Sequence, residues 1–153
     1  MSKTLIHWYR NDLRTHDHPV YEKADGYDHF IPLFIIQPNW FATAQWGFPS
    51  MGAHRYRFLL ETLNDLDQQL KKKGNQLIVK FGGPREVFYS LKESYPNAQV
   101  FYQKEHTDYE LEEEQLLEEI FEDQTESFEG LSLFHPEDIP FEIEKIPDVF
   151  TGF

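Results

Sequence analysis

One stretch of the chain constrains its fold more than any other, because it is short and almost unbroken in apolar residues. Residues 29–36 read His-Phe-Ile-Pro-Leu-Phe-Ile-Ile, far short of the roughly 18 apolar residues that cross a bilayer. Short runs of this kind are typical of strands buried on both faces, as in parallel sheets. Pro32 removes one backbone donor, so we expect it at the beginning of the strand or in an edge strand.

Further apolar segments alternate with helical patterns along the chain. The clearest helical pattern is a stripe of leucines between Leu59 and Leu70, which is followed by three lysines and Gly74. The alternation predicts an α/β fold, a doubly wound, Rossmann-like sheet of five parallel strands with helices on both faces. We expect strands at residues 4–9, 29–36, 76–81, 99–103 and 131–134, and further helices at residues 19–24, 84–94 and 108–122.

The last stretch of the chain has a different character. Residues 135–153 contain three prolines and show neither a helical nor a strand period. Their many apolar side chains need a surface to pack against. The sequence therefore predicts one α/β domain at residues 1–134, followed at residues 135–153 by an extended linker toward a second domain.

Composition excludes several classes of function. The chain has 153 residues, with 14 basic and 27 acidic side chains and a formal net charge of −13, which argues against nucleic-acid binding by this domain alone. Much of the acidic charge lies in residues 110–129, where it is typical of a solvated helix face. There is no cysteine, no secretory signal and no membrane-spanning run, so the default expectation is a cytoplasmic protein.

In open α/β sheets, ligands bind beyond the carboxyl ends of the strands. Four loops are therefore of interest, at residues 10–17, 37–52, 82–84 and 104–110. Neither the dinucleotide fingerprint G-x-G-x-x-G nor a P-loop is present. Residues 82–84, Gly-Gly-Pro, can offer amide donors to an anion, although such a sequence is more often a tight turn before a helix.

No other motif predicts a specific reaction. His16 and His18 can bind a metal together, but the sequence offers no suitably spaced third ligand. The three glutamates at residues 112–114 are expected to point mostly to water. The loop aromatics Trp46 and Phe48 can either stack on a flat ligand or simply cover the end of the sheet.

The segment Trp-Tyr-Arg-Asn-Asp-Leu-Arg at residues 8–14, followed by Asp17, resembles the photolyase/cryptochrome family. The resemblance continues in order along the chain, and its loop at Phe48-Pro49 and its ending are most similar to the DASH cryptochromes. Further matching positions are Gly52, Arg55, Phe58, Leu59, Glu61, Leu63, Asp65, Leu66, Gly82, Pro84, Lys104, Glu105, Glu110, residues 138–141 and residues 146–153.

The resemblance implies a five-stranded N-terminal α/β domain that often holds an antenna chromophore. In the family, a helical C-terminal domain binds FAD and the pyrimidine dimer in DNA, and performs light-driven electron transfer. The full-length parent is then expected to use blue light and FAD to repair DNA or to signal. This chain alone lacks that domain, so we expect no catalytic residues and no activity in it. Its partner is the helical domain of the same parent, through which alone it meets DNA.

The resemblance also suggests an antenna site. Glu110 is the candidate carboxylate for the amino and ring N–H groups of a pterin, and Trp46 or Phe48 is the candidate stacking face. The chromophore is expected to be methenyltetrahydrofolate, or alternatively a deazaflavin or FMN. His18 stands where the family usually has asparagine, and Arg14 with Asp17 is expected to form an ion-pair network that anchors the loop.

A second hypothesis is a stand-alone Rossmann-like module that binds a nucleotide or a partner protein without photolyase activity. The apolar ending of the chain motivates it, because unpaired apolar surface often marks an interface.

Overall fold

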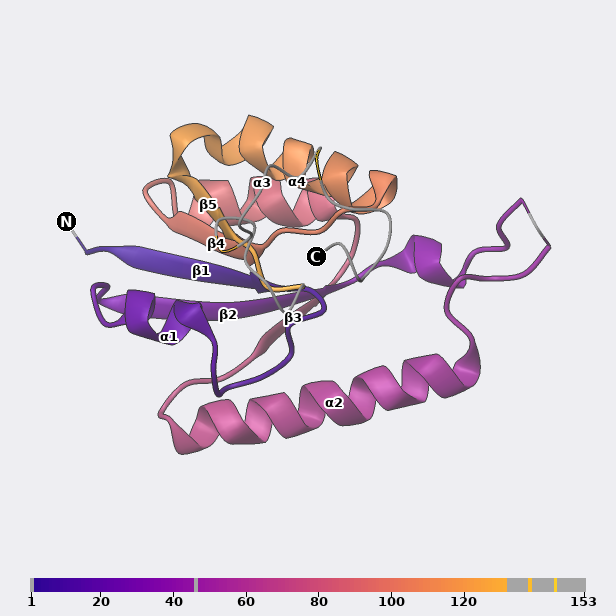
Figure 1. Cartoon of the computed structure of the whole chain (residues 1–153), viewed down its shortest axis with the longest axis horizontal. Helices are drawn as coiled ribbons and strands as arrows, with labels where there is room; N and C mark the ends of the chain where they lie inside the picture. Colours follow the sequence, from indigo (N-terminus) through magenta and orange to yellow (C-terminus); the bar gives the residue numbers. More distant parts are fainter. Residues whose placement is uncertain (1, 46, 132–137, 139–144, 146–153) are drawn as a thin grey trace.

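A computed structural model describes residues 2–45, 47–131, 138 and 145, and in it a central sheet lies between two layers of helices (Figure 1). The strands are β1 (Thr4–Tyr9), β2 (His29–Ile36), β3 (Ile78–Phe81), β4 (Gln99–Gln103) and β5 (Thr125–Phe128). The helices are α1 (Pro19–Ala24), α2 (Ala53–Lys72), α3 (Pro84–Ser94) and α4 (Asp108–Phe121), with short 3-10 turns at Pro38–Phe41 and Glu122–Gln124.

The five strands are all parallel and lie in the order β3-β2-β1-β4-β5. The chain winds outward from β1 to β3 and then returns to the other side of β1, so the strand order reverses between β1 and β4. The prediction of a doubly wound, five-stranded parallel α/β sheet is thereby confirmed. Ligands of such sheets bind at the carboxyl edge beside this reversal.

Helices cover both faces of the sheet (Figure 1). On one face, α3 and α4 bury Phe88 and Leu117 against β-strand side chains such as Leu33. On the other face, α2 buries the leucine stripe predicted from the sequence, including Leu66 and Leu70. Full burial of each such side chain contributes about 1.5–3 kcal/mol. None of the described helices has the length and apolarity needed to cross a bilayer.

The central strands explain the apolar run that the sequence shows. All six residues of β1 are buried, and β2 is buried from Ile31 onward. The expectation that Pro32 lies at a strand start or in an edge strand was wrong, because β2 is an interior strand. The pairing of β2 with β3 begins only at Leu33, so Pro32 has no paired residue in β3. The backbone N–H that proline lacks is therefore not needed on that side of the strand.

The prediction of the fifth strand was wrong. It was expected at residues 131–134, but β5 is Thr125–Phe128, and Leu131 lies outside it with 48% of its surface exposed. The sequence Thr-Glu-Ser-Phe carries little apolar signal, because β5 is a half-exposed edge strand. The third strand also begins at Ile78 rather than at residue 76. The predicted linker lies outside the described residues, apart from Asp138 and Lys145.

Candidate functional site

A cleft of about 910 Å³ opens at the carboxyl edge of the sheet. Three of the four predicted loops contribute to it, the ones that follow β1, β2 and β4, whereas residues 82–84 are not among its lining residues. Its volume suits a medium-sized organic ligand. The wall includes Arg10, Asn11, Arg14, Gln37, Trp40, Met51, Arg55, Phe58, Tyr109, Glu110 and Glu113.

Arg10 joins the loop after β1 to α4. Its guanidinium lies 3.6 Å from Glu113 Oε2, donates to Glu114 Oε1 through Nη1, and donates to the Glu110 carbonyl over 3.1 Å. It also lies 4.5 Å from the ring centre of Trp8. Its buried charge is therefore matched by two carboxylates, as a buried ion must be.

The expectation that residues 112–114 point mostly to water was wrong. Glu113 and Glu114 are buried and only Glu112 is exposed. Both glutamates lie beside Arg10, and Glu113 also lines the cleft. The cation compensates for the cost of burying them. The one sequence feature that could have indicated this is Arg10, which directly follows the apolar run of β1. An arginine buried at that position needs acidic partners from elsewhere in the chain.

Gln37, Tyr109 and Glu113 form a second polar group on the cleft wall. Gln37 Nε2 donates to Glu113 Oε1 over 2.5 Å, and the Tyr109 hydroxyl donates to Gln37 Oε1. Asn39 Nδ2 donates to the Tyr109 hydroxyl over 3.2 Å. Burial raises the pKa of Tyr109, so its hydroxyl stays protonated and remains a donor.

Glu110, the predicted chromophore carboxylate, lies in the cleft wall near the start of α4 and is half-buried. Its Oε2 accepts a hydrogen bond from the Thr107 hydroxyl. Among the described residues, Oε1 has no hydrogen-bond donor. One carboxylate oxygen is thus held in place, while the other can accept from a ligand.

The two predicted stacking residues have different positions. Phe48 is 61% exposed and is not among the lining residues, while Trp46 lies outside the described residues. A bridge between Thr43 and Pro49 folds their loop back on itself, and the loop projects away from the sheet (Figure 1). One of the aromatic residues that do line the cleft is Trp40, which was not predicted as a site residue although it follows β2 by only four residues.

Arg14 and Arg55 add positive charge to the cleft wall. The Nη1 of Arg55 donates to the Ser50 carbonyl over 3.2 Å. The expected ion-pair network of Arg14 and Asp17 is not formed among the described residues. Arg14 Nε instead donates over 3.0 Å to the backbone carbonyl of Asp17. Asp17 has a φ of 47°, a tight turn that aspartate tolerates better than most residues.

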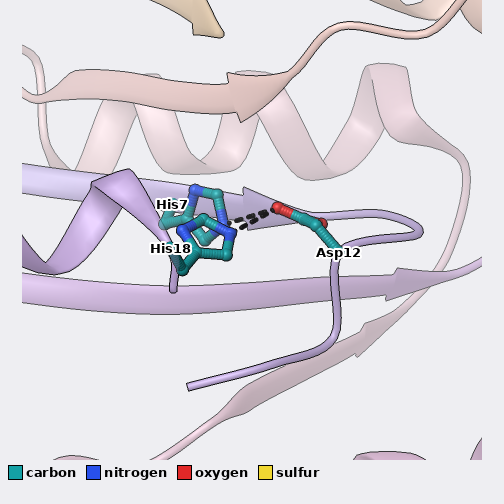
Figure 2. A group of neighbouring side chains, drawn as sticks. All are labelled: His7, Asp12 and His18. Atoms are coloured by element: carbon teal, nitrogen blue, oxygen red, sulfur yellow. Dashed lines mark hydrogen bonds and ion pairs between the residues drawn. The ribbon is translucent and has the colours of Figure 1, made fainter. Parts of the chain in front are cut away.

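Behind the cleft, His7, Asp12 and His18 form a buried cluster (Figure 2). Asp12 Oδ2 lies 3.1 Å from His7 Nε2 and 2.8 Å from His18 Nε2. The pairing of His16 with His18, which the sequence made conceivable but did not predict, is not formed, since His16 is exposed and His18 turns inward to cap α1. The partners missed by sequence reasoning are His7, buried in β1, and Asp12, five residues later.

Burial alone would raise the pKa of Asp12, but the hydrogen bonds of His18 and His7 hold it well below its usual range. Asp12 is therefore a carboxylate at neutral pH. Burial lowers the pKa of His7, while the hydrogen bond and the charge of Asp12 act in the opposite direction. The cluster fixes the loop after β1, and this loop forms one side of the cleft.

Known proteins are similar to this chain in sequence and in fold. The family model described as DNA photolyase matches residues 5–153. The chain belongs to the DNA photolyase family. Two similar curated relatives are both called Cryptochrome DASH: that of Gloeobacter violaceus is 40% identical and that of Xenopus laevis 37% identical, each over 99% of this chain. The chain spans 31% and 30% of their respective lengths.

Solved structures in this photolyase family have the same fold. A cryptochrome from Synechocystis matches with a TM-score of 0.88 and 34% identity, over 99% of this chain and 32% of that one. A photolyase from Sulfolobus tokodaii matches with a TM-score of 0.69 over 86% of this chain and 32% of that one, and at 23% identity this likeness shows the fold alone. The resemblance to a photolyase/cryptochrome N-terminal domain of the DASH type is confirmed, and the stand-alone module is not favoured.

Proposed function

We propose that this domain binds an antenna chromophore in the cleft at the carboxyl edge of its sheet and passes the absorbed energy to a flavin elsewhere in the parent protein. The single observation that carries the proposal is Glu110, whose carboxylate faces a cleft of about 910 Å³ with one oxygen held by Thr107 and the other unpaired among the described residues. Such a carboxylate suits a ligand that presents two neighbouring N–H donors.

Methenyltetrahydrofolate fits this wall better than FMN or a deazaflavin. Its pterin ring offers amino and ring N–H donors to Glu110, and its anionic tail suits Arg14 and Arg55 on the same cleft wall. A phosphate near Glu110 and Glu113 would instead be repelled by two carboxylates. Trp40 offers an aromatic face for the flat ring.

The rest of the function belongs to the longer parent. We infer that a helical FAD-binding domain follows the α/β domain of residues 1–134, with residues 135–153 as the connection, and that it carries the light-driven repair of pyrimidine dimers or signalling. The names of the relatives and their greater length support this proposal. The net charge of −13 supports DNA contact through the helical domain only. A cytoplasmic location remains our expectation.

Titration of the purified chain with methenyltetrahydrofolate, FMN and a deazaflavin tests the proposal by absorbance and fluorescence. We expect saturable binding of the folate, weakened at least tenfold by Glu110→Gln, because charge-assisted hydrogen bonds contribute about 1.5–3 kcal/mol. Glu112→Gln is the matched control, since Glu112 lies on the same helix but is exposed. Saturable binding that is unchanged in Glu110→Gln would remove Glu110 from the site, and no binding of any chromophore would contradict an antenna function for this chain.

A further inference from the structure

The buried cluster of His7, Asp12 and His18 brings three elements together behind the cleft. His7 belongs to β1, Asp12 to the loop that follows it, and His18 is the N-cap of α1 (Figure 2). The side chains of all three are 0% exposed. Both histidines direct Nε2 at the same atom, Asp12 Oδ2. The number of protons in such a cluster follows from its hydrogen-bond partners.

The second nitrogen of each ring determines its tautomer. His7 Nδ1 lies 2.9 Å from the Phe101 carbonyl oxygen, which only accepts, so Nδ1 carries a hydrogen. His18 Nδ1 lies 3.2 Å from the Val20 backbone nitrogen, which only donates, so this Nδ1 is bare. His18 therefore carries its hydrogen on Nε2 and donates it to Asp12 Oδ2.

Asp12 is a carboxylate, because its pKa lies below the usual range, so it cannot donate. The remaining contact, between His7 Nε2 and Asp12 Oδ2, therefore lacks a donor if His7 is neutral. The bare nitrogen would then face a carboxylate oxygen at 3.1 Å, and two acceptors would meet in the core. From the geometry, we propose that the cluster holds one further proton on His7 Nε2, so that His7 is an imidazolium paired with the Asp12 carboxylate. Both nitrogens of His7 then donate, and Asp12 accepts from both histidines and, on Oδ1, from the Arg10 backbone N–H at 2.9 Å.

The charge balance of the core supports the same state. Without the extra proton, the cluster would bury a net charge of −1, and with it the cluster is neutral. Burial lowers the pKa of His7 and so disfavours an isolated imidazolium. We give more weight to the geometry, because both ring nitrogens of His7 face acceptors and the Asp12 carboxylate is buried with the cation as a pair. Around the pair lie Tyr9, whose hydroxyl is 2.5 Å from that of Tyr21, and the ring of Phe128 from β5. Neither tyrosine is charged at neutral pH, because burial raises the pKa of both.

A metal ion does not fit this donor set. A divalent ion bound by the cluster would need a bare Nε2 on both histidines. The Val20 amide holds His18 in the tautomer whose Nε2 carries a hydrogen, so His18 is a donor and not a ligand. His7 and Asp12 alone would leave a metal with two ligands.

The proton has a consequence for the cleft. Asp12 links the cluster to the Arg10 backbone, and both residues line the cleft. Loss of the proton would place two acceptors in contact at the base of this loop and loosen the wall. The inference concerns the resting domain and does not depend on which chromophore binds, so it can hold even if the antenna proposal fails.

Long-range proton–nitrogen NMR spectra of the ¹⁵N-labelled chain between pH 6 and 8.5 test the proposal. We expect both ring nitrogens of His7 to show the shifts of a protonated imidazolium across this range, and His18 to show a neutral ring with hydrogen on Nε2. A His7 spectrum with one bare nitrogen at pH 7 would overturn the proposal. So would a stoichiometric metal found by elemental analysis whose removal changes the His18 signals.

Two variants sharpen the measurement. In Asp12→Asn the anion is lost, and we expect His7 to give up its proton and show one bare nitrogen at pH 7. In His16→Gln, which alters an exposed histidine of the same loop, the His7 spectrum should not change. An unchanged imidazolium in a folded Asp12→Asn chain would contradict the pairing. If Asp12→Asn does not fold, the His7 spectrum of the unaltered chain at pH 7 still distinguishes an imidazolium from a neutral ring.

Discussion

Arg10 donates to Glu114 across 104 positions of the sequence, and this contact fastens the loop after β1 to the first half of α4. Glu114 Oε1 also accepts from the Glu105 backbone N–H over 2.8 Å, so the same oxygen orders the loop after β4. One buried carboxylate therefore holds two of the three loops that form the cleft. The strand order reverses between β1 and β4, so the pair joins the two loops that flank this reversal.

Replacing Arg10 with leucine should destabilise the domain strongly. The substitution leaves Glu113 and Glu114 buried without a cation, and the loss of one partner from a buried ion pair costs about 3–5 kcal/mol. The free energy of unfolding from urea titrations measures this. Arg57→Leu is the control, because the ion pair of Arg57 with Glu61 is exposed and should contribute no more than about 0.5 kcal/mol. Equal effects of the two substitutions would contradict the role given to Arg10.

Asp12 should make the domain sensitive to acid. Its folded-state pKa lies below the unfolded value of about 3.9, so its stabilisation is fully present above that value and is lost as the pH falls from there through the folded-state pKa. Each unit of the pKa difference corresponds to about 1.4 kcal/mol. We expect the free energy of unfolding to drop between pH 5 and pH 2.5 more steeply in the original chain than in Asp12→Asn. If the free energies of unfolding of the two chains fell in parallel with pH, Asp12 would have the same pKa in the folded and the unfolded state, and the prediction would be wrong.

Gly130 should tolerate no side chain. A Cβ at this position would lie 2.7 Å from Oε1 of the buried Gln103 and 3.1 Å from the Phe128 ring. We expect Gly130→Ala to cost about 1–3 kcal/mol, as overpacking does, when unfolding is followed in urea. Gly26→Ala is the matched control, because the nearest atom to a Cβ there is the Lys23 carbonyl oxygen at 3.5 Å, an ordinary contact. A neutral Gly130→Ala would mean that Gln103 moves aside freely.

The sequence predicted the parts of the fold that depend on local pattern. Leu63, Leu66 and Leu70 of α2 are buried as expected, and so are the apolar runs of β1 and β2, because each of these residues faces the core. The edge strand β5 was misplaced because none of its four residues is fully buried, so its sequence resembles that of a loop. Edge strands owe their conformation to the neighbouring strand, which local sequence does not reveal.

The candidate site was predictable as a place but less so as a set of contacts. The carboxyl ends of parallel strands meet at one edge, so the loops could be chosen, and Glu110 indeed lines the cleft. The burial of Glu113 and Glu114 depends on Arg10, about one hundred positions away. The meeting of His7 with His18 depends on where α1 begins. Pairings of this kind arise from tertiary packing.

Trp40 should contribute more to chromophore binding than Phe48. Trp40 lines the cleft and packs at 6.4 Å from the Phe34 ring, whereas Phe48 is mostly exposed on the projecting loop. Aromatic stacking contributes about 0.5–1.5 kcal/mol, so Trp40→Leu should weaken folate binding several-fold, while Phe48→Leu should change it less than twofold. Fluorescence titration of both variants measures this. The reverse ranking would place the chromophore on the outer loop, beyond the cleft, and would make that loop part of the binding surface.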